Sequence, residues 1–194
     1  MKLILVRHGE TDDNKNRRSG NLETSLNEKG FEQAKKIGAR LKNYSFDKVI
    51  VSPLKRTRQT AKEILKFHSI KPEYEERIVE VNRGIFQGLP SKEFWERAKD
   101  SGNVITYKPP NGESIEELRI RTRNYFEDLI EKEKGKTILV VSHGGVITNA
   151  LLHLLKKHLD EFKNYLPENT ALTILQIKDD EKHEIQKLNC VKHL

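Results

Sequence analysis

The chain has 194 residues, of which 36 are lysine or arginine and 29 are aspartate or glutamate, so its formal net charge is +7. This length predicts one domain, at roughly 150 residues per domain, and allows one real core. Charged residues make up 34% of the chain, against about 25% in a typical globular protein, so we expect a heavily charged surface. The 11 glycines and 6 prolines are too few for a collagen-like or low-complexity chain.

Neither a membrane span nor a disulfide framework is expected. The longest apolar runs, such as residues 3–6 and 138–141, fall far short of the ~18 apolar residues that a span needs. The run after Met1-Lys2 is also too short for the core of a signal peptide. The single cysteine, Cys190, excludes an internal disulfide and a metal site built from several cysteines. We therefore predict a globular cytoplasmic protein with no membrane partner.

The excess of positive charge suggests an anionic partner, either nucleic acid or a phosphorylated metabolite. A lysine-rich surface that is merely solvated is the alternative. The chain shows no regular basic stripe interleaved with aromatic residues and no nucleic-acid motif, so we expect no nucleic-acid partner. The question that matters is whether the arginines gather in one place.

The first half of the chain predicts two strands, each followed by a helix. Residues 3–6 and 49–51 are short apolar runs without alternation, which is typical of strands buried on both faces. Asn27 is suited to cap a helix whose apolar residues continue to Leu41. Ser52, followed by a proline, fits the N-cap of a helix that runs through residue 65.

Residues 81–112 differ from the rest of the chain. They combine glycines, prolines and aromatic residues, with one short helix expected from Ser91. This mixture predicts a cover over the sheet rather than one of its layers. Phe86, Trp95 and Tyr107 either pack against the organic part of a substrate or form the cover's own small core.

The last part of the chain predicts further strands and helices. Ser114 begins a capping-box pattern that opens a long helix, which Gly135 is expected to end. The other expected elements are a buried strand at 138–141, a buried helix at 146–155, strands at 172–177 and 183–188, and a turn at 178–182.

Strands that alternate with helices imply an α/β fold with a mostly parallel sheet covered on both faces. We predict a three-layer α/β/α sandwich, and an antiparallel arrangement is open to the C-terminal strands. Residues 1–194 are expected to form a single domain. Residues 81–112 would be a short cover insertion over the carboxyl ends of the strands.

Basic side chains follow the buried strands. Arg7, His8, Arg56 and His143 each come just after a predicted strand, and ligands of open α/β sheets bind at the carboxyl ends of strands. If the three strands are neighbours, these side chains converge. Guanidiniums offer paired donors to a tetrahedral oxyanion, and a neutral imidazole can attack phosphorus. A surface Arg-His pair or a structural histidine is the alternative, but the threefold recurrence favours an anion site, with no metal.

Residues 7–11, Arg-His-Gly-Glu-Thr, resemble the signature of the histidine phosphatase superfamily, which includes the cofactor-dependent phosphoglycerate mutases. Further matches follow in consistent order to about residue 170. They are Asn14, Arg17 and Gly20; Leu26, Gly30, Gln33 and Ala34; residues 52–61; Glu80, Gly84, Gln87 and Gly88; residues 112–114; and residues 142–145.

The resemblance implies a role for each matched residue. His8 would be the nucleophile that forms a phosphohistidine. Glu80 would be the general acid for the leaving group and then the base for water. The phosphoryl oxygens would be held by Arg7, Arg56 and His143, with further substrate contacts from Asn14, Arg17, Gly20 and the backbone at Gly144. No cofactor is expected.

The same resemblance leaves a choice between a phosphatase and a phosphoglycerate mutase. Family mutases protect the phosphorylated intermediate with a sizeable insertion after the acid, whereas only 31 residues, 81–111, separate Glu80 from Gly112 here. Mutases also tend to carry an aromatic residue shortly before the first asparagine, whereas Asp12 and Asp13 precede Asn14 here, and Arg83 lies where mutases resemble one another in having tyrosine. We predict a metal-independent phosphatase of small phosphorylated metabolites, with the mutase as the alternative. Arg83 is expected to pair with a second negative group of the substrate, and a homodimer is open through the C-terminal hairpin.

Overall fold

One mixed sheet of six strands forms the centre of the computed structural model, which describes residues 1–179 and 182–194. The strand order is β3-β2-β4-β1-β5-β6. The strands are β1 (Lys2–Arg7), β2 (Lys48–Val51), β3 (Glu73–Tyr74), β4 (Thr137–Ser142), β5 (Leu172–Gln176) and β6 (Glu184–Cys190). β1 to β4 run parallel, whereas β5 and β6 are antiparallel to their neighbours. Within the described ranges no helix is long and apolar enough to cross a bilayer.

The three apolar runs pair as neighbours, as the anion-site hypothesis required. β4 lies between β1 and β2, with Arg7 opposite Ser142 and Val51 opposite Val141. Their carboxyl ends therefore meet at one edge of the sheet. The predicted α/β class, the mostly parallel sheet and the antiparallel C-terminal strands are confirmed.

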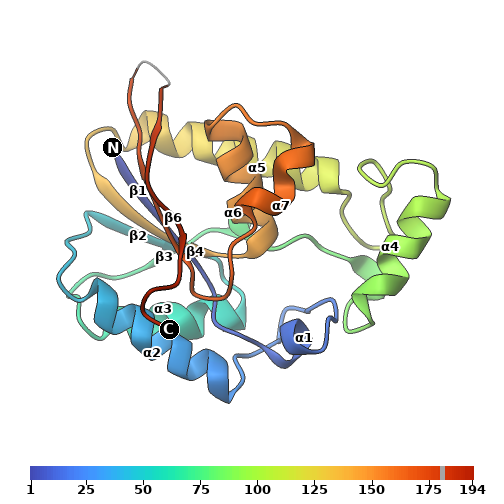
Figure 1. Cartoon of the computed structure of the whole chain (residues 1–194), viewed down its shortest axis with the longest axis horizontal. Coiled ribbons are helices and arrows are strands. Elements are labelled where there is room, and N and C mark those ends of the chain that lie inside the picture. Colours follow the sequence, from blue (N-terminus) through green and yellow to red (C-terminus); the bar gives the residue numbers. More distant parts are fainter. Residues whose placement is uncertain (180–181) are drawn as a thin grey trace.

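Helices cover both faces of the sheet and define two cores (Figure 1). α2 (Glu28–Leu41) and α3 (Lys55–Leu65) pack on one face, and α5 (Ile115–Lys132) and α6 (Gly144–Leu154) pack on the other. Alternate residues of β1 supply each core: Leu3 and Leu5 face α5 and α6, while Ile4 and Val6 face α2 and α3. All four are fully buried, which explains why the run is apolar without alternation.

Two of the predicted helix caps are present. The Asn27 side chain accepts a hydrogen bond from Gly30 N at 2.8 Å, and Ser114 and Glu117 form the expected capping box. The predicted start of α3 is wrong, because Leu54, not Ser52, is its N-cap. Ser52 is held at the end of β2 instead, where its hydroxyl lies 2.7 Å from His143 Nε2.

The remaining boundaries shift by a few residues. α5 ends at Lys132, and Gly135 lies in the turn before β4 with φ of 77°. β5 ends at Gln176, one residue earlier than predicted, and β6 begins at Glu184, one residue later. Part of the predicted turn, residues 180 and 181, lies outside the described residues.

The short elements have no clear signal in the sequence. They are α1 (Asp12–Lys15), α7 (Phe162–Tyr165), β3, and the 3₁₀ turns Glu76–Ile78, Gly84–Phe86 and Leu159–Glu161. Each is too brief to show a period in its apolar residues.

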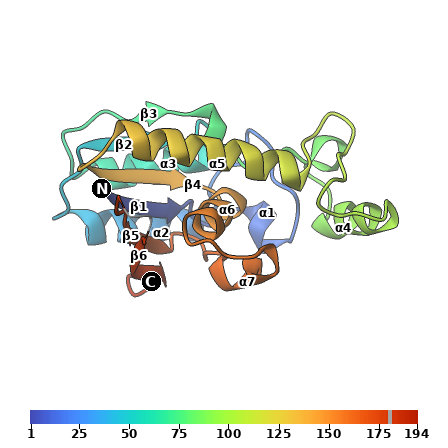
Figure 2. The same ribbon diagram turned by 90° about the horizontal axis from the view of Figure 1, so that it is seen from above.

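Residues 81–112 run from the sheet to one end of the molecule and back (Figure 1). They contain α4 (Ser91–Asp100), which both views place at one end of the structure beyond α1 (Figure 2). Phe86, Phe94 and Ala98 form a small separate core, against which Val104 and Tyr107 pack. Phe86 and Tyr107 therefore belong to the segment's own core. The status of 81–112 as an insertion into a single domain stays a prediction.

The backbone of the first turn of α2 lies directly against the backbone of the loop that follows β1. A Cβ atom on Gly30 would lie 2.0 Å from Glu10 O, and one on Gly9 would lie 2.4 Å from Gly30 O. Gln33 Oε1 also accepts a hydrogen bond from Glu10 N. Glycine at both positions lets α2 fix the loop immediately after His8.

We expect Gly30→Ala to lower the free energy of unfolding by about 1–3 kcal/mol, because the added methyl group meets backbone that cannot rotate away. Urea denaturation measures the change. Lys35→Ala, an exposed position on the same helix, should change it by less than about 0.5 kcal/mol. Equal stability of Gly30→Ala and the parent chain would contradict this packing.

Candidate active site

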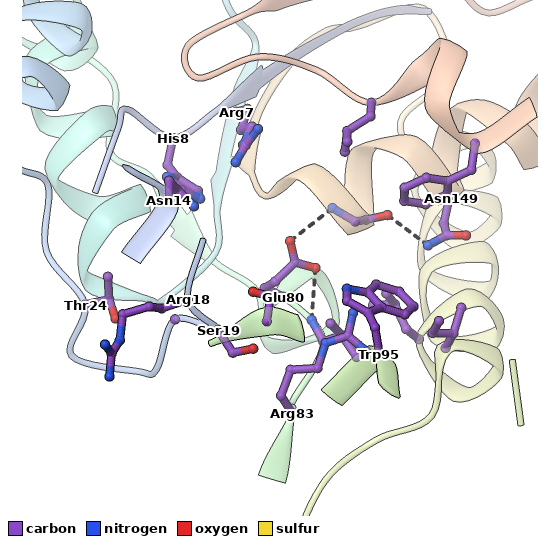
Figure 3. Close-up of a pocket in the computed structure, with 18 of the residues that line it drawn as sticks. Arg7, His8, Asn14, Arg18, Ser19, Thr24, Glu80, Arg83, Trp95 and Asn149 are labelled. Carbon is purple, nitrogen blue, oxygen red and sulfur yellow. Dashed lines mark hydrogen bonds between the residues drawn. The ribbon is translucent and has the colours of Figure 1, made fainter. Parts of the chain in front are cut away.

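A cavity of about 410 Å³ opens at the carboxyl ends of β1, β2 and β4 (Figure 3). Arg7 and His8 from the end of β1, Arg56 from α3, and Glu80 all line it. His143 lies beside His8, with 5.2 Å between the ring centroids. The structure therefore brings the five predicted catalytic residues together.

His8 is a buried, neutral imidazole. Its side chain is only 3% exposed, and Nδ1 lies 2.7 Å from the carbonyl oxygen of Gly9. Because a carbonyl can only accept, Nδ1 carries the hydrogen and Nε2 keeps its lone pair. Burial, followed by the positive charges of Arg56 and Arg7, holds the pKa of His8 well below its usual range.

His143 is a second buried imidazole, and it forms the N-cap of α6. Nε2 contacts the Ser52 hydroxyl at 2.7 Å, while Nδ1 is buried and has no hydrogen-bond partner within the described part of the chain. Burial and then the charge of Arg56 hold the pKa of His143 well below its usual range. Two neutral rings thus stand next to each other.

Two guanidiniums are fixed in the same place by backbone carbonyls. Arg7 Nη1 donates to Pro167 O at 2.7 Å, and Arg56 Nη1 donates to Asn21 O at 2.8 Å. Burial lowers the pKa of Arg7, and it lowers the pKa of Arg56 to about 10. Both remain cations at neutral pH. Arg7 Nε is buried without a partner among the described residues, so this donor is available to an oxyanion.

The Glu80 carboxylate is held against the first turn of α6. Oε2 accepts a hydrogen bond from Gly145 N, and Oε1 accepts one from Val81 N, both at 3.0 Å. A Cβ atom on residue 145 would lie 2.4 Å from Glu80 Oε1. Glycine at that position is therefore what lets the carboxylate reach the helix and the cavity.

Asn14 also lines the cavity, and its orientation depends on a residue that the sequence did not single out. Asn169 Nδ2 donates to Asn14 Oδ1 at 3.2 Å and to the carbonyl of His8 at 3.0 Å. Asn169 therefore occupies the acceptor end of the Asn14 amide and leaves its NH₂ group for a ligand. Asn169 lies 155 positions after Asn14. Only the folded chain therefore reveals that it orients the Asn14 amide.

The predicted contact at Arg17 differs from the structure. Arg17 is exposed and does not line the cavity, whereas its neighbour Arg18 does, and Arg18 Nε donates to Gly88 O. Gly20 lines the cavity as expected. Gly144 begins α6 at its edge, where an added Cβ would lie 3.6 Å from the Arg7 guanidinium carbon. Two adjacent arginines cannot be told apart from sequence spacing alone.

Arg83 lines the cavity on the other side of Glu80 from His8 (Figure 3). Its guanidinium carbon lies 3.8 Å from the ring centroid of Phe94 and 4.9 Å from that of Trp95, a cation–π arrangement. Burial lowers its pKa to about 10. Nη1 is buried and has no partner in the described ranges.

No group of three or more His, Cys, Asp or Glu side chains in residues 1–179 and 182–194 is arranged to hold a metal ion.

Comparison with known proteins adds the family to this geometry. A family model described as the histidine phosphatase superfamily (branch 1) matches residues 3–191. Phosphoserine phosphatase 1 of Hydrogenobacter thermophilus is 30% identical over 200 residues, covering 100% of this chain and 94% of that protein. Phosphoglycerate mutase-like protein 4 of Arabidopsis thaliana is 31% identical over 202 residues, covering 100% and 86%. The crystal structure of phosphoserine phosphatase from Entamoeba histolytica in complex with 3-phosphoglyceric acid has a TM-score of 0.84 and 26% identity, covering 99% and 98%.

The two lowered histidine pKa values predict how stability depends on pH. In the unfolded chain these imidazoles take up protons below about pH 6.5, whereas in the folded chain they stay neutral. As the pH falls below about 6.5, the free energy of unfolding should decrease by up to about 1.4 kcal/mol per pH unit for each imidazole. Above about pH 7 this contribution is constant.

Nitrogen NMR of labelled protein tests the cause directly. We expect His8 to remain neutral, with its hydrogen on Nδ1, at a pH at which the histidines of the unfolded chain are protonated. In the urea-unfolded chain all 7 histidines should titrate near pH 6.5, to within about half a unit. An imidazolium signal from His8 at pH 6 in the folded protein would contradict this account of the site.

Proposed function

This chain belongs to the histidine phosphatase superfamily, and on that premise we propose that it hydrolyses small phosphate monoesters through a phosphohistidine on His8. It is a phosphomonoesterase of the histidine phosphatase type. The state of His8 carries the proposal. Its ring is buried and neutral, with the Nε2 lone pair available beside the guanidiniums of Arg7 and Arg56.

In the first step His8 Nε2 attacks phosphorus in line with the ester oxygen. The new P–N bond forms as the bond to the alcohol oxygen breaks, and Glu80, which enters this step as the neutral carboxylic acid, gives its proton to that oxygen. Arg7 and Arg56 hold the other phosphoryl oxygens, where the negative charge of the transition state is spread. Because their guanidiniums are already bound to backbone carbonyls, little reorganisation accompanies the reaction.

In the second step water replaces the alcohol. The Glu80 carboxylate takes a proton from the water as its oxygen bonds to phosphorus, and the P–N bond breaks to return the lone pair to Nε2. Phosphate then leaves, and both His8 and Glu80 regain their starting protonation. The bonds from Gly145 N and Val81 N to Glu80 hold the carboxylate in place for both proton transfers.

His143 and Asn14 complete the oxyanion site. If the Ser52 hydroxyl donates to His143 Nε2, the unpartnered Nδ1 carries a hydrogen that can bond a phosphoryl oxygen. The NH₂ group of Asn14, oriented by Asn169, supplies a second neutral donor. These donors add affinity without raising the positive charge that keeps His8 neutral.

Hydrolysis is favoured over phosphoglycerate mutase activity. A mutase has to keep water from the phosphorylated enzyme, but the cavity that His8 lines also includes side chains open to solvent, with Trp95 39% and Leu166 44% exposed. We therefore expect water to reach a phosphorylated His8 through this cavity. A mutase assay primed with bisphosphoglycerate tests the alternative beside the phosphatase assay.

A second substrate group is expected at Arg83. Its buried Nη1 has no partner in the described ranges, and the flanking rings of Phe94 and Trp95 hold the guanidinium in position. Leaving a buried hydrogen-bond donor without a partner costs free energy. We therefore assign Arg83 to a carboxylate or other acceptor close to the ester carbon.

Two further expectations from the sequence stay predictions. One is a cytoplasmic location. The other is a homodimer through the C-terminal strands, where β6 forms an exposed edge of the sheet.

Replacement of His8 by alanine should lower kcat/KM for phosphate esters by at least about 10⁴-fold, because the nucleophile is lost. Release of inorganic phosphate measures the change. His153→Ala, at a partly exposed position in the last turn of α6, is the matched control and should retain activity. Chelating agents should leave the parent enzyme active. Activity that survives in His8→Ala, or disappears with the chelator, contradicts the proposed mechanism.

Arg83→Met should reduce the preference for phosphoglycolate over ethyl phosphate by roughly 10- to 100-fold, since a hydrogen bond to a charged group contributes about 1.5–3 kcal/mol. The two esters have the same chain length and differ by the carboxylate. Arg123→Met, an exposed position on α5, should leave the ratio unchanged. An unchanged ratio in Arg83→Met would remove Arg83 from the substrate site.

A further inference from the structure

The active-site cavity is lined in part by large apolar side chains, which stand beside polar ones such as Asn149. We define the apolar wall as Trp95, Ile105, Leu118, Leu159, Phe162 and Leu166, all of which line the cavity. They come from α4, the loop before α5, α5 itself, the turn before α7, α7, and the residue after it. Segments far apart in the sequence therefore build one surface.

Trp95, one residue of the apolar wall, lies beyond Glu80 as seen from the nucleophile (Figure 3). In Figure 3 the Glu80 carboxylate stands between the group of Arg7, His8 and Asn14 and the ring of Trp95. A phosphoryl group held by the arginines would therefore turn its ester oxygen toward Glu80. The carbon chain attached to that oxygen would continue onto the wall.

The charges around the cavity limit which groups the carbon chain of the substrate can carry. Glu80 is the only acid among the described residues that line it, and the proposed mechanism uses its carboxylate for proton transfer. An ammonium group on the leaving alcohol would find no other carboxylate there. Arg83, whose guanidinium stacks on Phe94 and Trp95, and Arg18 also line the cavity, and both offer sites for an acceptor rather than for a cation.

We infer that the preferred substrates are phosphate monoesters of alcohols that carry an apolar chain and no cationic group. This inference rests on the proposed function, because it assigns the leaving group of that same reaction. Leu166 and Trp95 are 44% and 39% exposed, so an apolar chain would remove from water surface that the free protein leaves hydrated. The apolar wall thus acts as a binding site for the leaving group.

A series of linear alkyl phosphates tests the inference: ethyl, butyl and hexyl phosphate. Their alcohols are nearly equal as leaving groups, so differences in kcat/KM report on binding of the chain. We expect kcat/KM to rise by roughly two- to fourfold for each added methylene, the upper value corresponding to a fully buried CH₂. Phosphoserine should be a poorer substrate than hexyl phosphate.

A pair of leucine variants ties the preference to the wall. Leu166→Ser should lower the hexyl-to-ethyl ratio of kcat/KM by about fivefold or more, as apolar contact is lost. Leu188→Ser removes a leucine of similar exposure, 38%, from β6 at the far edge of the sheet, and it should leave the ratio unchanged. Equal ratios in the two variants would overturn the assignment of the wall.

Binding of alkylphosphonates, measured by calorimetry, separates this inference from the mechanism. These compounds lack the ester oxygen, so they bind without reacting. Affinity that rises with chain length supports the inference whether or not any ester is hydrolysed. Ethyl phosphate hydrolysis with a flat or falling chain-length series overturns the inference and leaves the proposed function standing. Rising phosphonate affinity with no hydrolysis of any ester overturns the proposed function instead.

Discussion

The site depends on two cations buried against a neutral imidazole. Arg7 and Arg56 are fixed by the carbonyls of Pro167 and Asn21, and their charges help to keep His8 uncharged. A protonated His8 would have no lone pair for phosphorus and would repel both guanidiniums. The same charges that would bind a phosphoryl group therefore also keep the nucleophile ready. This coupling requires burial, because solvent would screen the three groups from one another.

The sheet brings these groups together, and its central part could be predicted from sequence. The runs at 3–6, 49–51 and 138–141 are apolar at every position because both faces of each strand are covered. Their pairing as β2-β4-β1 then places the residues after them at one edge. The helix caps at Asn27 and Ser114 could also be predicted, since capping depends on a few adjacent residues.

Features that depend on distant contacts could not be read in this way. The proline after Ser52 predicts a helix cap, but the Ser52 hydroxyl contacts His143, which is 91 positions away in the chain. Asn169 orients Asn14 across 155 positions, and local sequence carries no sign of it. The choice between Arg17 and Arg18 depends on how the chain turns after α1. The apolar wall combines residues 95, 105 and 118 with residues from 159–166, so only the folded chain reveals it.

The stereochemistry of transfer at phosphorus tests the central claim most directly. Each in-line displacement inverts the configuration, so a phosphohistidine pathway of two displacements must retain it. A monoester made chiral at phosphorus with oxygen isotopes and sulfur, hydrolysed in isotopically labelled water, gives a product whose configuration can be determined. The account predicts net retention. Net inversion would mean that water attacks the ester directly, and it would contradict a covalent role for His8.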